Sequence, residues 1–170
     1  MKSVYRPCLF PCVLAFLFLL PATSWSWQGK VVNIVNGDTI EILHDGKRET
    51  IRLYGIMVPV ESQAFSREAK KFTSEKVKGK TVSVKPLEKS PSGGIAATLV
   101  FERVNLNVEL VRAGYAWVYD QSCTRPECKA WKFIEAKARD EKNGLWSLPD
   151  PVPPWEYREA GAPGANSPKR

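Results

Sequence analysis

Three short segments rich in β-branched residues, separated by two turn signals, constrain the fold of this chain most strongly. The segments span residues 29–35, 39–43 and 48–56. Asn36-Gly37 follows the first segment, and both residues tolerate the positive φ of a tight hairpin turn. A second turn, over residues 44–47, precedes the third segment. Strands this close in sequence predict an antiparallel meander.

The rest of the chain alternates further strands with helices. Phe65, Ala69, Phe72 and Val77 recur at helical spacing, and Gly79 is placed to end that helix. Two more strands are expected over residues 80–84 and 95–101. After them we expect a short helix capped by Asn107, an extended aromatic segment over residues 115–119, and a helix with Trp131, Ile134 and Ala138 on one face. This order predicts a β-barrel plus α-helices: a five-stranded OB-fold with about three helices.

The N-terminus carries a predicted export signal. Lys2 and Arg6 precede an apolar run that ends at Leu20, which is shorter than a typical membrane-spanning helix. Pro21 and small residues follow, so residues 1–26 are interpreted as a secretory signal peptide rather than an uncleaved anchor. The protein is therefore expected to be exported to the periplasm or the extracellular medium, with no membrane span after cleavage.

Net charge and cysteine content restrict the possible functions of the chain that remains after signal-peptide cleavage. Removing residues 1–26 leaves 23 basic and 18 acidic side chains, a net charge of +5. This excess suits a polyanion such as nucleic acid, although it also serves solubility alone. Cys123 and Cys128 then form an even pair in an exported protein, which predicts a disulfide. A zinc site is disfavoured because it needs about four ligands, and His44 is the only histidine.

The segment Ile51–Phe65 (IRLYGIMVPVESQAF) reads as the end of a strand, a turn that Pro59 keeps out of helix, and the approach to a helix. It resembles the active-site segment of staphylococcal nuclease-like (thermonuclease) domains, usually Arg-Leu-x-Gly-Ile-Asp-Ala-Pro-Glu. The matching residues are Arg52, Leu53, Gly55, Ile56 and Pro59. Further matches follow in order at residues 36–40, 107–114, 116–119, 135–139, 144–146 and 153–156. The resemblance implies one OB-fold nuclease-like domain over residues 27–158. From Leu148 on, the prolines and Trp155 predict an extended segment that packs on the domain, and residues 159–170 are expected to form a disordered tail.

The resemblance also implies where catalytic side chains should lie. Family members that cleave nucleic acid hold calcium with two Asp and a backbone carbonyl, position water with a Glu and grip phosphate with two Arg. By position, Asp38 and Arg52 are retained, whereas Met57, Val60 and Gly94 replace the second Asp, the Glu and the second Arg. Calcium prefers oxygen to a thioether. Because losing one charge stabiliser lowers the rate by roughly a hundredfold or more, three losses predict an inactive or weak nuclease.

The sequence therefore supports three hypotheses. The first is an exported domain with a degraded catalytic site that binds nucleic acid or another polyanion without a cofactor; the expected binding residues are Arg52, Lys70, Lys71, Lys85 and Tyr115. The second is an active calcium-dependent phosphodiesterase or endonuclease that uses Glu61, shifted into the place of Val60 by a one-residue bulge. The third is an envelope protein-interaction module that ignores nucleic acid.

The retained site residues also have purely structural interpretations. Asp38 follows Asn36-Gly37 and could close an Asx-type turn. Arg52 could pair with a surface carboxylate such as Glu41. The basic residues of the helix after Phe65 could form a solvated face.

Overall fold

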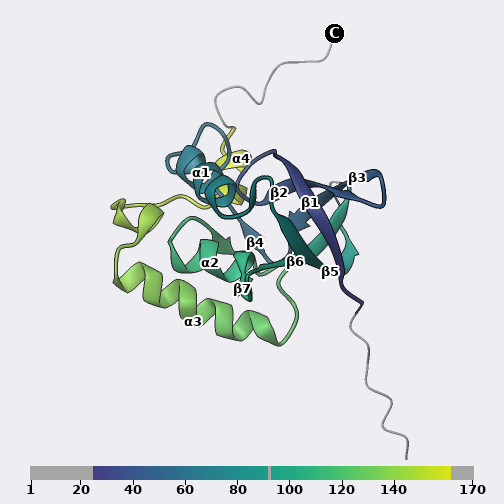
Figure 1. The fold of residues 1–170 in the computed structure, drawn as a ribbon. Coiled ribbons are helices and arrows are strands. Elements are labelled where there is room, and N and C mark those ends of the chain that lie inside the picture. Colours follow the sequence, from purple (N-terminus) through teal and green to yellow (C-terminus); the bar gives the residue numbers. More distant parts are fainter. Residues whose placement is uncertain (1–24, 92, 162–170) are drawn as a thin grey trace, which may run out of the picture.

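The computed structural model of the chain describes residues 25–91 and 93–161 (Figure 1). The predicted signal peptide, apart from Trp25 and Ser26, lies outside these residues, as do residues 162–170 of the predicted tail. Within the described part, none of the helices combines the length and apolar character that crossing a membrane requires.

The strands are β1 (Trp27–Ile34), β2 (Thr39–His44), β3 (Lys47–Leu53), β4 (Ile56–Met57), β5 (Thr81–Lys89), β6 (Ile95–Phe101), β7 (Val104–Asn105) and β8 (Trp117–Val118). The helices are α1 (Ser66–Val77), α2 (Leu106–Arg112), α3 (Glu127–Asp140), the 3-10 turn η1 (Gly144–Ser147) and α4 (Pro154–Glu159). Figure 1 shows the barrel strands on one side of the molecule and the helices on the other.

Five strands form a closed barrel, which confirms the predicted OB-fold. The order is β3-β2-β1-β5-β6, and a parallel pairing of β3 with β6, from Ile51 opposite Ile95, closes it. Alternate residues of each strand point inward, and their buried side chains include Ile40, Ile42 and Leu99. This closing pairing covers residues 51–53 of β3, so it protects the edge of the sheet at the end of the barrel where Arg52 lies. Four α-helices accompany the barrel in the described residues, against the three expected.

The hairpin between β1 and β2 forms as predicted, but not through positive φ at Asn36-Gly37. Neither residue has positive φ; the left-handed turn lies at Asp45-Gly46, between β2 and β3. Gly37 serves close packing instead, because a Cβ there would lie 2.9 Å from the Ala69 Cβ of α1. The Gly37 carbonyl also accepts a 2.7 Å hydrogen bond from the Thr73 hydroxyl of that helix.

The third predicted strand ends earlier than expected, at Leu53 rather than Ile56. Gly55 takes a φ of 71°, which turns the chain out of the barrel. Ile56 and Met57 then form β4 and pair with β8, with Ile56 opposite Val118. This turn positions the site segment between the barrel and the C-terminal half of the chain.

The cap of the helix after β7 is Asn105, not the predicted Asn107. The Asn105 side chain accepts hydrogen bonds from the backbone N–H groups of Asn107 and Val108. Asn107 is fully buried, and its amide nitrogen donates to the carbonyl oxygens of Tyr54 (2.9 Å) and Ala97 (3.3 Å). Because the Asn107 side chain points inward from the first turn of α2, it hydrogen-bonds to the barrel instead of capping the helix.

The C-terminal segment is partly helical, whereas an extended tail was expected. Pro154 stands at the first turn of α4, where its fixed φ favours a helix start and its missing N–H leaves no hydrogen bond unmade. The predicted docking of Trp155 is confirmed, because its ring lies 5.1 Å from Tyr119 and 6.5 Å from Trp117, centroid to centroid. The helix runs to Glu159, the first residue of the predicted disordered tail.

The predicted disulfide is confirmed: Cys123 and Cys128 are joined by a 2.05 Å S–S bond. It joins the loop after β8 to the first turn of α3 and packs against the turn that follows β3. A Cβ on Gly55 would lie 2.5 Å from the Cys123 sulfur, so only glycine allows this approach.

Candidate functional site

Asp38 and the residues after β3 meet at the end of the barrel. Asp38 is 1% exposed, and its carboxylate accepts hydrogen bonds from the Thr39 hydroxyl (2.9 Å) and the Val58 backbone N–H (3.1 Å). Val58 directly follows Met57, so the two positions expected to hold the metal-binding acids are neighbours in space. The Asx-type turn is made by Asn36, whose side chain accepts from the Asp38 N–H, and not by Asp38 itself.

Arg52 lines a surface hollow of about 270 Å³, here called the Arg52 hollow. Arg52 is half-buried on β3, opposite Thr39 on β2 and Ala96 on β6. Four parts of the chain supply the polar lining, which consists of Arg52, Tyr54, Glu88, Ser90, Tyr119, Ser122 and Arg158. Glu41, the expected carboxylate neighbour of Arg52, forms an ion pair with Arg48 at 3.2 Å.

The three substituted positions differ in how they have been accommodated. Met57 is 8% exposed and lines the Arg52 hollow, so a thioether stands where the second acid was expected. Val60 is half-buried, and its N–H donates to the Gln63 side-chain oxygen at 2.9 Å. Gly94 has a φ of 80°, and a Cβ there would lie 2.4 Å from the Thr50 carbonyl oxygen. The backbone around residue 94 therefore excludes any larger side chain, arginine included.

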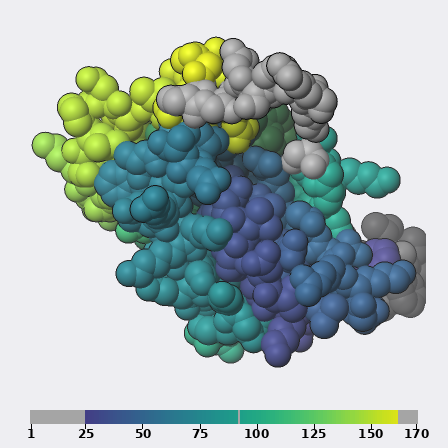
Figure 2. All heavy atoms as spheres, turned by 90° about the horizontal axis from the view of Figure 1, so that it is seen from above, coloured from purple at the N-terminus to yellow at the C-terminus, as the bar shows by residue number. Residues whose placement is uncertain are grey.

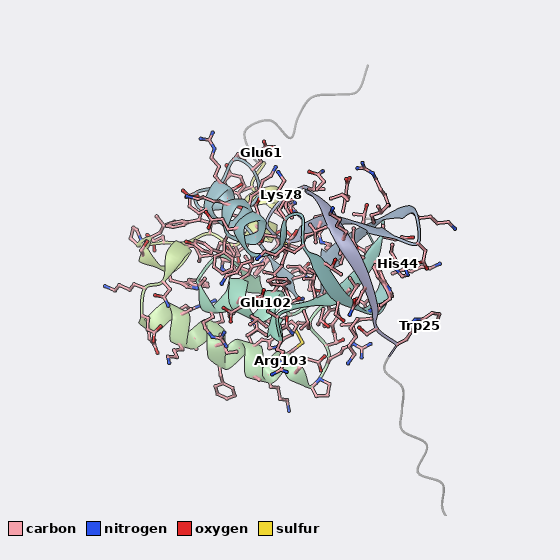
Figure 3. All side chains as sticks on the ribbon, in the orientation of Figure 1. Trp25, His44, Glu61, Lys78, Glu102 and Arg103 are labelled. Carbon is pink, nitrogen blue, oxygen red and sulfur yellow. A yellow bond between two sulfur atoms is a disulfide. The ribbon has the colours of Figure 1, made fainter. Side chains whose placement is uncertain are left out.

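Glu61 lies apart from Arg52. It is exposed on the loop that leads into α1, and Figure 3 shows it at the surface beside that helix. It lines a different hollow, of about 530 Å³, together with Arg67 and Glu68, and it is absent from the lining of the Arg52 hollow. Among the described residues, the carboxylate that lines the Arg52 hollow is Glu88, from the end of β5.

The residues present do not fit a calcium ion. Each Asp38 oxygen already accepts a hydrogen bond, and the Met57 thioether is a poor donor to a hard cation. Over residues 25–91 and 93–161, no three His, Cys, Asp or Glu side chains are grouped to hold a metal ion. This donor set differs from the two acids that the family resemblance implied.

The other residues expected to bind nucleic acid lie elsewhere. Lys70 and Lys71 are exposed on α1, where Lys71 lies 3.8 Å from Glu75, and Lys85 is exposed on β5. Tyr115 packs against the aromatic rings of α1, 5.3 Å from the Phe72 ring centroid. None of the four lines the Arg52 hollow.

Sequence reasoning missed Arg158, Glu88 and Tyr119 as lining residues. The sequence signal for Arg158 was Trp155 next to two prolines. A helix that begins at Pro154 and packs through Trp155 brings the following residues back over the domain. Glu88 and Tyr119 had no comparable signal. Their approach to Arg52 depends on barrel closure and on the β4–β8 pairing.

Comparisons with known proteins identify a family and several relatives. A family described as "Staphylococcal nuclease homologue" matches residues 50–148. The chain is similar to an Escherichia coli protein named "Uncharacterized endonuclease", with 38% identity over 149 residues that cover 87% of this chain and 95% of the relative. A Haemophilus influenzae "Uncharacterized endonuclease" is 32% identical over 157 residues, 91% and 86% of the two chains. A Shigella flexneri "Micrococcal nuclease" is 28% identical over 162 residues, 89% and 92% of the two chains.

Proposed function

Because the chain belongs to the staphylococcal nuclease homologue family, we propose that it binds nucleic acid through the Arg52 hollow without hydrolysing it in a calcium-dependent way. The observation that carries this proposal is the lining of the hollow. Arg52 is present there, and Met57 occupies the position at which nucleases of the family have their second metal-binding acid. A guanidinium binds phosphate with two parallel hydrogen bonds, whereas hydrolysis also needs a positioned water and a stabilised leaving group.

The size of the hollow suits part of a polymeric ligand. Its volume of about 270 Å³ is slightly below the roughly 300–1,000 Å³ typical of sites that enclose a whole small molecule. One phosphate with its sugar would fill such a space, while the rest of the strand lies on the surface. The exposed lysines of α1 and β5 would then add sequence-independent attraction rather than direct contacts in the hollow.

A working nuclease is the second candidate, favoured by the names of the relatives that include the word endonuclease or nuclease. It requires a carboxylate near Arg52 that can orient water. Glu88 lines the Arg52 hollow, but the carboxylate expected to orient water is Glu61, which lies in another hollow. A nuclease that uses Glu61 therefore requires the loop before α1 to rearrange. An envelope protein-interaction module, the third candidate, predicts neither binding nor cleavage of nucleic acid.

One experiment separates the three candidates. The protein beginning at Trp27 is incubated with fluorescein-labelled single-stranded DNA, with calcium and with EDTA, while binding and cleavage are followed at several salt concentrations. We expect binding that weakens with salt and is lost in Arg52→Gln, and no cleavage above background. Calcium-dependent cleavage that disappears in Glu61→Gln would contradict the proposal and favour the nuclease. Absence of both activities would favour the protein-interaction module.

Restoring the missing acids tests whether the substitutions explain the expected lack of hydrolysis. Met57→Asp places a second carboxylate beside Asp38, so calcium affinity measured by calorimetry should rise at least tenfold. Adding Val60→Glu should give measurable cleavage, and the gain should exceed the product of the single effects because such groups act as a unit. Arginine at residue 94 is left out because the Thr50 carbonyl excludes it. No gain in calcium affinity would show that the two positions do not form one site.

Export is part of the proposal. It rests on the charge, the apolar run and the small residues of segment 1–26. The intact mass of protein recovered from the periplasm or the medium should correspond to a chain that begins at Trp25 or Trp27. A full-length chain confined to the cytoplasm would refute export.

A further inference from the structure

The Arg52 hollow contains a second arginine, which comes from the opposite end of the domain sequence. Arg158 stands in the last turn of α4, and its side chain lines the same hollow as Arg52. The two arginines are separated by more than one hundred residues of chain, so their meeting depends on how the C-terminal segment folds back.

Three contacts hold the C-terminal segment in this position. The Trp155 ring packs against both Trp117 and Tyr119, and Pro154 is buried. The Gln63 side chain donates a 2.9 Å hydrogen bond to the Val152 carbonyl while it accepts from the Val60 N–H. Figure 2 shows the yellow C-terminal residues beside the blue residues that lead into α1. The segment that carries Arg158 is therefore tied to the loop that follows Met57.

The charges that line the hollow favour an anion. Among the described residues that line it, Arg52 and Arg158 contribute two positive charges, and Glu88 contributes one negative charge. A phosphate carries acceptor oxygens on several sides, so two guanidinium groups from different walls can each bind it through paired hydrogen bonds. Residue 94, where the family resemblance expected the second arginine, cannot supply one.

We propose that Arg158 is the second phosphate-binding cation of this site, delivered by α4, and that the ligand is the sugar-phosphate backbone of a single-stranded nucleic acid. The proposal rests on the nucleic-acid binding proposed above. It adds a specific residue and assigns α4 to the binding site rather than to the stability of the barrel alone.

The test compares matched variants of the protein beginning at Trp27, with fluorescein-labelled oligothymidylate as the probe. Arg158→Gln should weaken binding by about tenfold and lower the slope of log K against log salt by about one. Arg158→Lys should restore the salt slope but only part of the affinity, because lysine keeps the charge and lacks the planar fork. The control is Arg103→Gln, on the exposed β6–β7 turn (Figure 3), which removes the same charge outside the hollow and should change affinity less than twofold.

A further variant tests the role of α4 as the carrier of Arg158. Trp155→Ala removes the docking contact and leaves every charge in place, so its affinity should fall almost as far as that of Arg158→Gln. Equal behaviour of Arg158→Gln and Arg103→Gln, with binding still lost in Arg52→Gln, would overturn this inference and leave the proposed function standing. No salt-sensitive binding by the unmodified protein would overturn both.

Discussion

Two walls of the Arg52 hollow carry one arginine each, and different interactions hold the two walls in place. Arg52 stands in β3, between the hydrogen-bonded ladders to β2 and β6, and its neighbours Ile51 and Leu53 are fully buried. Arg158 stands on a six-residue helix whose described contacts with the body include an indole ring and a buried proline, and a side-chain hydrogen bond holds Val152 just before the helix.

The difference predicts different dynamics for the two cations. Local opening requires less free energy where few apolar contacts and few backbone hydrogen bonds must break. The barrel wall should therefore keep Arg52 in place until the whole domain unfolds, whereas α4 should detach first and carry Arg158 with it. The following predictions test this contrast, from the largest expected effect to the smallest.

The barrel wall should depend strongly on Asn107. This buried side chain bonds the backbone of Leu99, Tyr54 and Ala97. The Ala97 carbonyl also accepts from the Tyr54 N–H, so Asn107→Ala removes the side-chain partner of two further buried groups, the Leu99 N–H and the Tyr54 carbonyl. We expect the free energy of unfolding in urea to fall by about 2–6 kcal/mol, because each of these two groups contributes about 1–3 kcal/mol. Asn105→Ala, which removes only a helix cap, should lower it by about 1 kcal/mol. Equal losses would show that Asn107 does not make the barrel contacts described above.

The disulfide should have an intermediate effect. Cys123 and Cys128 are five positions apart, and so short a loop predicts a stabilisation of about 2 kcal/mol by loop-length scaling. The double substitution Cys123→Ser/Cys128→Ser should lower the free energy of unfolding by that amount. The oxidised protein should also be two hydrogens lighter than its dithiol form. Two alkylatable thiols in unreduced protein would refute the bridge.

Removing the C-terminal segment should destabilise the domain less. Truncation after Ser147 deletes the docked Trp155, and the lost burial of a half-buried indole should lower stability by about 1–2 kcal/mol, which is several degrees in melting temperature. Truncation after Arg158 keeps these contacts and should leave the melting temperature unchanged. If both truncations act equally, the segment does not dock as described.

Glu88→Gln should have the smallest effect and the opposite sign. It removes the negative charge from the lining of the Arg52 hollow, so affinity for oligothymidylate should rise about two- to fivefold, as expected for one repulsive pair in a solvent-exposed setting. Glu102→Gln, in the exposed turn that precedes β7, is the matched control and should leave affinity unchanged. A fall in affinity would mean that Glu88 orients an arginine rather than opposing the ligand.

The barrel could be predicted from the sequence because its signals are local. Alternating apolar residues and turn residues predict strands wherever they occur, and the family resemblance supplied their order. The turn at Gly55 was missed because its cause, the packing of Cys123 against that glycine, comes from a distant segment. The role of Gly37 was missed for the same reason, since the Ala69 contact is not visible in the hairpin motif.

The site was only partly predictable. Arg52 and Met57 were found by aligning the continuous segment 51–65 with the family pattern, and Asp38 by aligning the turn at residues 36–40. These three residues lie together at the end of the barrel. The expected binding residues Lys70, Lys71, Lys85 and Tyr115 were chosen by residue type and element, which does not determine what lines a hollow. Arg158 required knowledge that the proline-rich segment begins a helix and returns to the barrel.

The position of α4 has a consequence for the order in which the protein becomes competent. Every barrel strand precedes residue 102, whereas Arg158 lies more than fifty residues later. As the chain emerges from its N-terminus, at the ribosome or at an export channel, all barrel strands are therefore available before α4. On the inference made above, the emerging domain carries only one of its two phosphate-binding arginines during that interval. Full affinity for polyanions then arises only once α4 has emerged and docked.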